Sequence, residues 1–476
     1  MAFSVELWVE SLLTLLYCLT ILGLVLVVIF ENRNPVKSMA WIAVLLMLPG
    51  LGILFYFFFG QDNRKQRIVS HRSYRRIKKG AYKQAIGKAS SPIPANYHRL
   101  SKLLNQMGDA PLLYGSNIGI YINGKEKVDA LLKDIRSAKH FIHIEYYIFM
   151  DDEVGQMIKD ALIAKVKEGV CVRFIYDDVG SWSTKKRFFH EMRQAGIEVY
   201  AFLPVAFPRF TSKVNYRNHR KIVVIDGLVG YIGGMNIANR YVDGLEWGTW
   251  RDTHFRIEGE GVHGLQMAFL LDWYVVSQVI LVDKLYYPQP KVFGDNLLQV
   301  ITSGPTGLWR TLLQAIIHMV SNAKKYIYIQ TPYFIPPEGL NKALLTAALS
   351  GVDVRLMIPK RSDTKMANWA TRSFIEEMLC AGVSLFFYQP GFLHSKLILT
   401  DDTVSCIGSA NMDFRSLEHN FEIAAFVYEE AFTKTMKEHF LADCKQCEPI
   451  SFPRWKARPK LIQLKESFMR LFSPLL

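Results

Sequence analysis

The most apolar part of the chain is its N-terminal end. Residues 11–30 carry no charge, and a helix of that length, rising about 1.5 Å per residue, spans the hydrocarbon core of a bilayer. A second uncharged run, Met39–Gly60, follows directly and is interrupted at Pro49. A membrane helix tolerates such an interruption better than a soluble one. The pattern predicts a two-helix transmembrane hairpin over residues 1–60, with Glu31–Ser38 as the connecting turn.

A cleaved signal peptide is the alternative interpretation of the first apolar run. Its start carries Glu6 and Glu10 where a signal peptide has basic residues, and a second apolar run follows at once. Both features favour membrane helices that stay in the protein.

Downstream, short β-branched runs alternate with longer runs of helical periodicity, which is typical of α/β layering. The expected strands are Phe141–Phe149, Val170–Tyr176 and Ile222–Ile225 in the first half, and Tyr326–Ile335, Val352–Ile358 and Leu397–Leu399 in the second. The expected helices are Gly155–Glu168, Lys185–Gln194, Trp309–Asn322 and Asn341–Ser350.

The two halves of this region repeat one another. The matching segments are Lys139–Tyr147 with Lys325–Tyr333, Gly169–Arg173 with Gly351–Arg355, and Ala195–Ile197 with Ala381–Val383. We therefore expect an α/β fold of two pseudo-twofold related repeats, each a mixed sheet flanked by helices, with a site at their junction. The expected parts are the hairpin (1–60), a basic juxtamembrane linker (61–108), a first repeat (109–285), a second repeat (286–450) and a basic amphipathic C-terminal segment (451–476).

Charge is concentrated at the two flanks of this body. Residues 61–90 carry a formal charge of +9 and residues 451–476 carry +5, which account for the whole net charge of +14. The positive-inside bias places residue 61 onward, and the N-terminus, in the cytoplasm. Residues 61–90 are either a solvated linker or, as we favour, a surface that rests on anionic headgroups.

The C-terminal segment combines apolar periodicity with positive charge. Apolar residues recur at helical spacing at Leu461, Leu464, Phe468, Leu471 and Leu475, with Lys465 and Arg470 elsewhere around the helix. The pattern predicts a basic amphipathic helix, which lies either in the membrane interface or against the body of the protein.

Cysteine usage indicates no metal site. Cys444 and Cys447 form a single CxxC, with no second pair and no histidine at ligand spacing. We predict no metal and no cofactor.

Both halves carry the same spaced set of polar residues. The first set is His219-x-Lys221, Asp226 and Gly233-Gly234-x-Asn236, and the second is His394-x-Lys396, Asp401 and Gly408-Ser409-x-Asn411, with identical gaps. One HxK alone is common by chance, but agreement of two copies at the histidine, lysine, aspartate, glycine and asparagine is not.

The spacing has a physical meaning. Histidine and lysine two apart on a strand point to one face, so imidazole and ammonium groups converge on one substrate. Asp226 and Asp401 belong to the expected catalytic set, although each lies where its strand turns, and we favour a role in fixing backbone N–H groups. Gly233-Gly234 and Gly408-Ser409 would permit close approach of the backbone to a phosphate.

The duplicated HxKxxxxDxxxxxxG(G/S)xN segments resemble those of the phospholipase D superfamily. With its N-terminal hairpin, the Asn34–Trp41 connector and the C-terminal Ser473–Leu476, the whole chain is similar to the bacterial cardiolipin synthases of that superfamily.

The resemblance implies that one histidine attacks phosphorus to give a phosphohistidine. The other protonates the leaving alkoxide and then deprotonates the incoming hydroxyl. By family analogy His219 is the nucleophile and His394 the acid and base, a choice that the residues alone do not make. The groups expected to hold the non-bridging oxygens are those of Lys221, Lys396, Asn236 and Asn411.

Each histidine also needs a carboxylate that fixes its tautomer. The candidates are Asp252, 33 residues after His219, and Glu422, 28 residues after His394.

Two further residues lie in the paired first strands of the repeats. These are Glu145 and Tyr333, which we expect to line the pocket.

The expected reaction is transphosphatidylation between two molecules of phosphatidylglycerol, with glycerol and cardiolipin as products. A hydrolytic phospholipase D, or a synthase that uses another alcohol, carries the same motifs. A nuclease does too, but residues 91–450 are nearly neutral, with a formal charge of +1, and nucleic-acid binding requires a positive surface. A membrane scaffold without activity is disfavoured by the two intact motifs.

The expected partners are therefore phosphatidylglycerol, cardiolipin and an anionic membrane surface, with no nucleic acid. The expected location is the inner membrane of a bacterial cell, with two transmembrane helices and the catalytic body in the cytoplasm. The sequence leaves open whether the chain forms a homo-oligomer.

Overall fold

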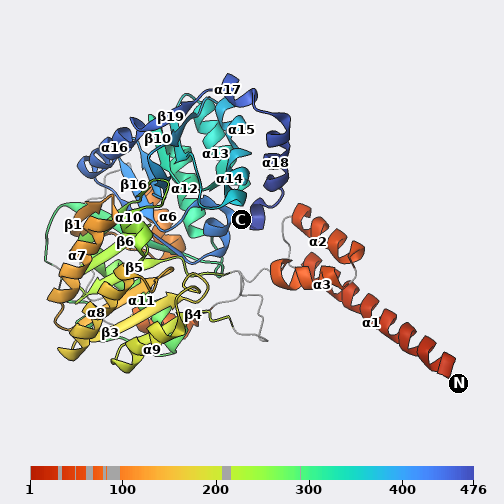
Figure 1. Cartoon of the computed structure of the whole chain (residues 1–476), viewed down its shortest axis with the longest axis horizontal. Helices are drawn as coiled ribbons and strands as arrows, with labels where there is room; N and C mark the ends of the chain where they lie inside the picture. The colour runs from red at the N-terminus through yellow and green to blue at the C-terminus, as the bar shows by residue number, and fades with distance from the viewer. Residues whose placement is uncertain are drawn as a thin grey trace. The chain divides into compact units, whose positions relative to one another are not determined.

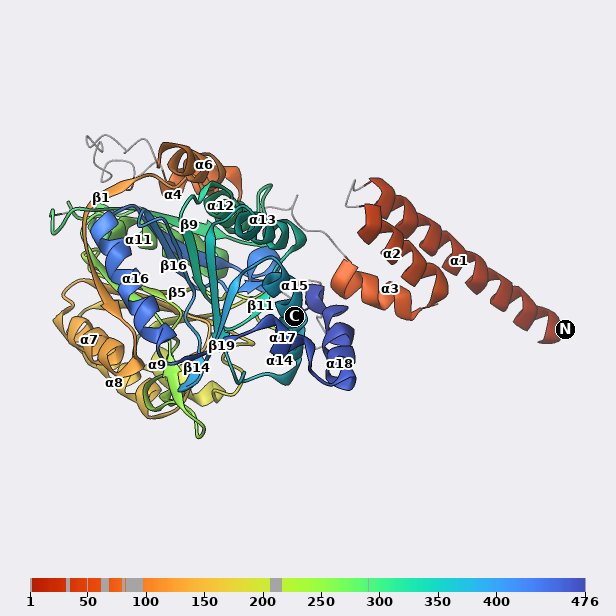
Figure 2. The same cartoon turned by 90° about the horizontal axis from the view of Figure 1, so that it is seen from above.

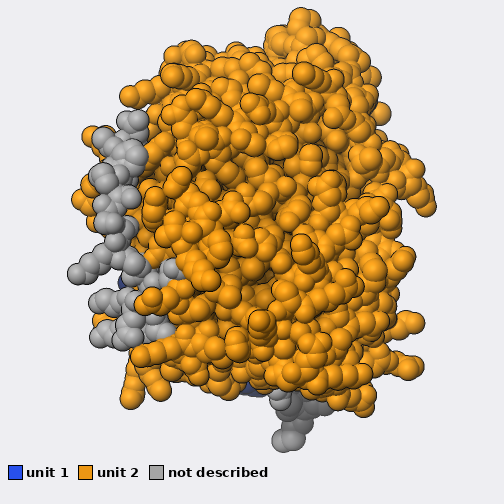
Figure 3. All heavy atoms as spheres, turned by 90° about the vertical axis from the view of Figure 1, so that its left-hand side faces the viewer, with its two compact units in different colours: residues 1–63, 205–215 blue, residues 64–204, 216–476 orange. Residues whose placement is uncertain are grey.

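A computed structural model describes residues 2–30, 35–48, 50–60, 68–78, 82, 97–205, 216–289 and 291–475. The chain divides into two units, residues 1–63 with 205–215 and residues 64–204 with 216–476. The larger unit is drawn in orange in Figure 3.

The smaller unit is helical. It contains α1 (Ala2–Phe30), α2 (Pro35–Met47), α3 (Leu51–Phe55) and the π-helical turn η1 (Tyr56–Gly60). Among the described residues α1 is the one helix that is long and apolar enough to cross a membrane, over the 23 residues Trp8–Phe30. The 13 residues of α2 span only about 20 Å at 1.5 Å per residue. The second apolar run is thus divided among shorter helices, and α2 ends two residues before Pro49, as the restricted backbone before proline favours.

Contacts within this unit join its apolar runs. Ile21 and Val28 of α1 form a buried cluster with Leu45 of α2 and with Tyr56, whose ring meets Trp41 edge to face at 5.6 Å. Of the predicted connecting turn, residues 31–34 lie outside the described residues and residues 35–38 belong to α2.

The larger unit is built on one 15-stranded sheet whose two halves are arranged alike. From the centre outward, the first half runs β1 (Leu113–Tyr121), β8 (His254–Glu258), β6 (Val229–Gly233), β5 (Lys221–Ile225), β2 (Phe141–Tyr146), β3 (Cys171–Asp177) and β4 (Glu198–Phe202). The second half runs β9 (Asn296–Ser303), β18 (Glu422–Val427), β16 (Val404–Gly408), β15 (Leu397–Thr400), β10 (Tyr326–Gln330), β12 (Asp353–Pro359), β13 (Ser384–Tyr388) and β19 (Cys447–Ile450).

Strands β1 and β9 pair antiparallel at the centre and so join the halves. In each half the inner strands are antiparallel and three consecutive strands farther out, β2–β3–β4 or β10–β12–β13, are parallel. In the second half β19 adds an antiparallel strand at the edge. This repeated order confirms the predicted α/β fold of two related repeats.

Helices cover both sides of the sheet. The helices of the first half are α7 (Gly124–Ser137), α8 (Glu153–Lys167), α9 (Lys186–Gln194), α10 (Asn239–Asp243) and α11 (Gly261–Ser277), and those of the second are α12 (Thr311–Asn322), α13 (Glu338–Leu349), α14 (Lys365–Arg372), α15 (Ile375–Cys380) and α16 (Glu430–Cys444). Figures 1 and 2 show α7 and α8 beside the first half and α12 and α13 beside the second.

Shorter elements complete the unit. They are α4 (His71–Ile77), α6 (His98–Gly108), α17 (Phe452–Lys456), α18 (Lys460–Arg470), the turns η4 (Lys284–Tyr286), η5 (Arg415–His419) and η6 (Ser473–Leu475), and the two-stranded pairs β11 (Phe334–Ile335) with β17 (Met412–Asp413) and β7 (Thr249–Arg251) with β14 (Gly391–Leu393).

The two repeats share a core. One buried cluster contains Ile222 of the first half together with Leu397 and Ile423 of the second. Helix α11 is buried around most of its circumference and packs on strands of the first half and on β9, as expected for a helix that is apolar on all sides. The expected boundary at residue 285 therefore marks a repeat and not a separately folded core.

The strand register corrects the internal alignment of the repeats by one residue. Glu145 pairs with Ile222, and Gln330 pairs with Leu397. Ile222 and Leu397 each follow the lysine of a motif, so Glu145 corresponds to Gln330. The sequence match had aligned Glu145 with Thr331.

Candidate active site

The two histidine–lysine motifs lie at equivalent places, where β5 and β15 begin. His219 is 8% exposed and His394 is 7% exposed, so each imidazole is nearly enclosed. Lys221 and Lys396 are buried beside them. This burial is the source of the electrostatic properties described below.

Each histidine is hydrogen-bonded to a carboxylate from the other half. Nδ1 of His219 lies 3.0 Å from Oε1 of Glu422, and Nδ1 of His394 lies 2.5 Å from Oδ2 of Asp252. Sequence distance had associated Asp252 with His219 and Glu422 with His394. The structure exchanges these partners, and the exchange brings both motifs into one site.

The backbone explains the exchange. The segment that precedes Glu422 pairs in parallel with the segment that precedes His219. The backbone N–H of His219 donates to the Phe421 carbonyl at 2.9 Å. In the same way β14 pairs in parallel with β7, and the His394 N–H donates to the Arg251 carbonyl at 2.7 Å. Each histidine is therefore held beside the end of a segment from the other half, where the carboxylate follows.

Burial sets the protonation of the imidazoles. It lowers the pKa of His219 to about 4, against the opposing effect of Glu422, and burial together with Lys396 lowers the pKa of His394 to about 4. Burial alone would disfavour ionised carboxylates, but the neighbouring histidine and lysine in each case hold the pKa of Glu422 and of Asp252 below its ordinary value. At neutral pH each imidazole is thus neutral, and if Nδ1–H donates to the carboxylate, the lone pair of Nε2 is available to a substrate.

The lysines are buried cations with weakened proton affinity. The Lys221 ammonium donates to the His219 carbonyl at 2.6 Å, and the Lys396 ammonium donates to the His394 carbonyl. Burial lowers the pKa of Lys221 to about 7 and that of Lys396 to about 8. A bound anion would raise both values again, because an opposite charge favours the ionised form.

The second position of each G(G/S)xN segment packs against a carboxylate. A side-chain carbon on Gly234 would lie 2.1 Å from Oδ1 of Asp252. Ser409, the equivalent residue of the second half, donates its hydroxyl to Glu422. Gly234 therefore leaves space for the Asp252 carboxylate, whereas Ser409 donates a hydrogen bond to the Glu422 carboxylate.

The first position of each segment packs against the next strand. A side-chain carbon would lie 2.5 Å from the Thr253 carbonyl oxygen at Gly233, and 2.2 Å from the Ile423 carbonyl oxygen at Gly408. These contacts give the three glycines a packing role and Ser409 a hydrogen-bonding role, and the expected approach of the backbone to a phosphate stays a prediction.

The two asparagines differ. Oδ1 of Asn236 accepts the Ile148 N–H at 3.1 Å, and its amide nitrogen donates to the Tyr241 hydroxyl at 2.5 Å. The amide nitrogen of Asn411 donates to Asp413 at 3.1 Å, and within the described part of the chain its Oδ1 is buried without a hydrogen-bond partner. Both amide nitrogens are thus already engaged, whereas Asn411 retains an acceptor.

The motif aspartates lie away from the histidines. The five residues of β5 separate Asp226 from the start of the strand by roughly 16 Å, and Asp401 follows β15 in the same way. Both residues have positive φ, 54° and 56°. Their carboxylates accept backbone N–H groups at 2.7–2.9 Å, those of Lys139, His140 and Phe141 for Asp226 and those of Lys324, Lys325 and Tyr326 for Asp401. Their place in the catalytic set is therefore corrected to the turn role.

Two arginines fix the backbone of the carboxylate residues, and sequence reasoning missed them. Arg220 donates to the Glu422 carbonyl at 3.1 Å and forms an ion pair with Asp272 on α11. Arg251 donates at 2.7 Å to the carbonyl of the residue that follows it, and pairs at 2.8 Å with Asp443 on α16. The available signal was Asp272, the one charged residue of the apolar helix α11, because charged residues are seldom buried unless paired. Asp443 had no such signal, since α16 carries several charged residues.

The two further candidates have different surroundings. Glu145 is 1% exposed and lies under the motif, where it accepts from the Asn218 side chain, and burial raises its pKa well above the usual range. It does not line an open pocket. Tyr333 is partly buried in an apolar cluster with Phe392, and its hydroxyl donates to Asp363 at 2.6 Å.

Different rings lie against the two imidazoles. The ring of Tyr147 meets His219 at 4.8 Å. Trp250 and Phe392 lie 5.1 and 5.7 Å from His394. The second histidine thus faces a larger apolar wall.

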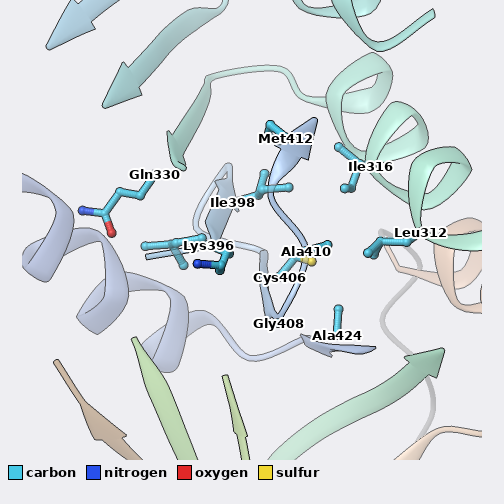
Figure 4. Close-up of a pocket in the computed structure, with 11 residues that line it drawn as sticks. Leu312, Ile316, Gln330, Lys396, Ile398, Cys406, Gly408, Ala410, Met412 and Ala424 are labelled. Atoms are coloured by element: carbon cyan, nitrogen blue, oxygen red, sulfur yellow. The ribbon is translucent and has the colours of Figure 1, made fainter. Parts of the chain in front are cut away.

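A small cavity lies in the second half, with Lys396, Ile398, Leu312 and Met412 among its lining residues (Figure 4). Its volume of about 20 Å³ has room for about one water molecule. It is therefore a packing defect of the core and not the space in which a phosphodiester reacts.

Known proteins resemble this chain over nearly its full length. Residues 131–247 and 316–444 match the family described as "Cardiolipin synthase, PLD-like domain", and residues 18–61 match a phospholipase D-nuclease N-terminal family. A cardiolipin synthase of Alkalihalophilus pseudofirmus is 39% identical over 98% of this chain and 95% of its own length. The major cardiolipin synthase of Bacillus subtilis is 38% identical over 98% of this chain and 99% of its own length.

Among solved structures, a phosphatidylserine synthase of Haemophilus influenzae superposes with a TM-score of 0.61. The match covers 80% of this chain and 99% of that one at 16% identity. At that identity the likeness concerns the fold alone.

Proposed function

Because this chain belongs to the cardiolipin synthase family of phospholipase D-like proteins, we propose that its paired histidines transfer the phosphatidyl group of one phosphatidylglycerol to the terminal hydroxyl of a second. The family makes the chain a phosphatidyltransferase. The observation that carries the proposal is the exchanged pair of histidine–carboxylate contacts, His219 with Glu422 and His394 with Asp252.

In the first step Nε2 of His219 attacks phosphorus. The bond between phosphorus and the glycerol headgroup oxygen breaks, and His394 donates a proton to that oxygen so that glycerol leaves. Glu422 accepts the Nδ1–H of His219, and its negative charge stabilises the positive imidazole that forms. In the second step neutral His394 takes the proton of the incoming hydroxyl, which attacks phosphorus and releases His219.

Binding of substrate prepares His394 for the first step. Its pKa of about 4 in the free protein leaves it neutral at pH 7. A phosphodiester brings a negative charge into a nearly enclosed site, which raises the pKa of a neighbouring imidazole. Lys221 and Lys396 supply the positive charge for the non-bridging oxygens, and Oδ1 of Asn411 is free to accept a substrate hydroxyl.

The decisive experiment uses phosphatidyl-p-nitrophenol, whose leaving group departs without a proton. We expect His394→Ala to release one p-nitrophenol per enzyme and to retain a covalent phosphatidyl group that mass spectrometry locates on His219. His219→Ala should show neither. The reverse pattern would exchange the two roles, and if wild-type enzyme releases no glycerol from phosphatidylglycerol, the proposed reaction is wrong.

Product analysis separates this reaction from hydrolysis and from other acceptors. Purified enzyme receives phosphatidylglycerol in micelles together with serine or ethanolamine. We expect cardiolipin and glycerol in equal amounts. Phosphatidic acid or another phosphatidyl ester as the main product would identify a different acceptor.

We place the smaller unit in the bacterial cell membrane, with α1 and the α2–η1 region as two crossings and the larger unit in the cytoplasm. The charge of +9 over residues 61–90 supports this orientation and a contact with anionic headgroups. Protease added to inverted vesicles should cleave the larger unit, whereas intact spheroplasts should protect it. Cleavage of the larger unit in intact spheroplasts would show that this unit lies outside the cytoplasm.

A further inference from the structure

The last helix, α18, has two faces of opposite character. One face packs against α14, where Met469 is 7% exposed and Arg470 forms an ion pair with Glu377 at 2.7 Å. Glu466 is buried and pairs with Arg458 at 2.7 Å. These contacts hold the helix to the body, as one of the two interpretations of the sequence anticipated.

The other face is apolar and bare. Leu461, Leu464 and Phe468 are 65%, 66% and 57% exposed. They recur at the spacing that places them on one side of a helix, turned away from Met469. Leu471 and Leu475 extend the row past the helix end and are 74% and 49% exposed. A continuous row of five large apolar side chains on a protein surface marks an interaction site.

Basic residues flank this row. Lys456, Lys460 and Lys465 are exposed, and within the described residues no carboxylate lies in ion-pair distance of any of them. Together with the apolar row, these ammonium groups make a surface that complements an apolar layer edged by negative charge. An anionic phospholipid bilayer has that chemistry.

Helix α14, against which α18 packs, also lies near the active site. Helix α14 follows Asp363, which accepts from the Tyr333 hydroxyl in the cluster beside His394. Asp363 is also close enough to act on the pKa of His394 and of Lys396. The apolar row and one side of the site are therefore linked through a single short helix.

We propose that the bare face of α18, with η6, is a second membrane contact, which docks the catalytic unit on the surface of an anionic bilayer. The contact lies in the interface and does not cross the membrane, since the 11 residues of α18 span only about 17 Å. It would orient the site toward headgroups in the plane of the bilayer. This inference concerns how the enzyme meets lipid and holds whichever phosphodiester it transfers.

Photocrosslinking in the full-length protein tests the contact directly. The pair to compare is Leu464→p-benzoylphenylalanine and the same substitution at Leu349, a leucine of α13 that is 73% exposed and belongs to no such row. In vesicles of phosphatidylglycerol and phosphatidylcholine we expect lipid adducts at residue 464 at least about fivefold above those at residue 349, because only the first face enters the interface. Equal yields would overturn the proposal. Adducts of residue 464 with protein, from residues 1–63 or from a second copy, would also overturn it by identifying a different occupant.

A kinetic comparison tests whether the contact matters for turnover. We expect the double variant Leu464→Glu and Phe468→Glu to lose about tenfold in glycerol release from anionic vesicles, and to match wild type on short-chain phosphatidylglycerol in solution. The control is Leu349→Glu, which should match wild type on both. An equal loss on the short-chain substrate would indicate damage to the fold, and unchanged activity on vesicles would contradict the docking role. Absence of turnover by wild type on either substrate would count against the proposed reaction and leave the crosslinking result to decide on docking.

Discussion

The first and second halves surround equivalent histidines with different neighbours. His219 is paired with a glutamate, Glu422, which a serine hydroxyl from Ser409 holds in place. His394 is paired with the shorter Asp252, whose carboxylate occupies the space left by the missing side chain of Gly234. The rings beside them also differ, with one tyrosine at His219 and a wider aromatic wall at His394.

The comparison shows that the repeat conserves a geometry by different means. The longer side chain of Glu422 accepts a hydrogen bond from Ser409. The shorter side chain of Asp252 packs against Gly234, which has no side chain. In both cases an arginine fixes the backbone carbonyl of the carboxylate residue, and a buried aspartate holds the arginine. The carboxylate and its neighbour are therefore expected to tolerate substitution only together.

The largest effect should follow from removing the charge of either carboxylate. Glu422→Gln and Asp252→Asn should each lower kcat/KM by roughly 10²- to 10⁴-fold, since the histidine loses its tautomer and its counter-charge. Because the partners are exchanged, Asp252→Asn should accumulate phosphatidyl-enzyme from phosphatidyl-p-nitrophenol like His394→Ala, and Glu422→Gln should form little of it. Rapid-quench measurement of the intermediate distinguishes the two, and the opposite assignment would contradict the exchange.

A smaller effect is expected from breaking the fit around each carboxylate. In Gly234→Ala the new carbon would lie 2.1 Å from Asp252, so the carboxylate must move, and we expect roughly a 100-fold loss of kcat. Ser409→Gly removes one hydrogen bond to a charged group, which is worth about 1.5–3 kcal/mol, or roughly 10- to 100-fold. Steady-state kinetics at one pH suffice. If Gly234→Ala and Ser409→Gly both left kcat unchanged, the two halves would not depend on these different contacts to hold their carboxylates.

The lowered pKa values of Lys221 and Lys396 predict that activity falls at alkaline pH. A lysine is cationic below its pKa, so as the pH rises through about 7 for Lys221 and about 8 for Lys396 the free enzyme loses the charges that bind phosphate. We expect kcat/KM to fall several-fold over this range. The fall in kcat should come at higher pH because the bound anion retains the protons.

Substitution of each lysine by arginine tests which lysine causes which part of this decline in kcat/KM. Arginine stays protonated throughout, so Lys221→Arg should remove the earlier part of the decline and Lys396→Arg the later part. The pH dependence of kcat/KM for the two variants measures this. A decline that neither substitution moves would belong to another group.

The smallest effect on catalysis is expected at the motif aspartates. Asp226→Asn and Asp401→Asn each weaken three backbone contacts far from the histidines, and should cost about 1–2 kcal/mol of stability with kcat/KM unchanged within about twofold. Thermal unfolding in detergent and activity at low temperature separate the two quantities. A large loss of activity without loss of stability would return these residues to the catalytic set.

The sequence was sufficient where a signal was local or repeated. Short, continuously apolar runs predicted β5 and β15, and two equal gaps identified His219 and His394 as one site. The turn role of Asp226 followed from its place at a strand end. In each case the cause lies within a few residues of the effect.

The partners of the histidines could not be predicted in the same way. Which carboxylate faces His219 depends on the segment that lies beside it, some 203 residues away along the chain. Distance within the repeat instead suggested Asp252. The packing role of Gly234 was missed for the same reason, because its neighbour is set by strand pairing across the site and not by the motif itself.

The exchange of carboxylates also determines when the enzyme becomes active as it is made. Synthesis begins with the apolar N-terminal helix α1. The first half emerges with His219 and Lys221 in place, but Glu422 follows about 200 residues later, roughly 10–40 s of translation at 5–20 residues per second. Until then His219 has no carboxylate, whereas Asp252 precedes His394 by 142 residues. A nascent or truncated chain that ends before Glu422 thus has an incomplete site, and full activity requires both folded halves.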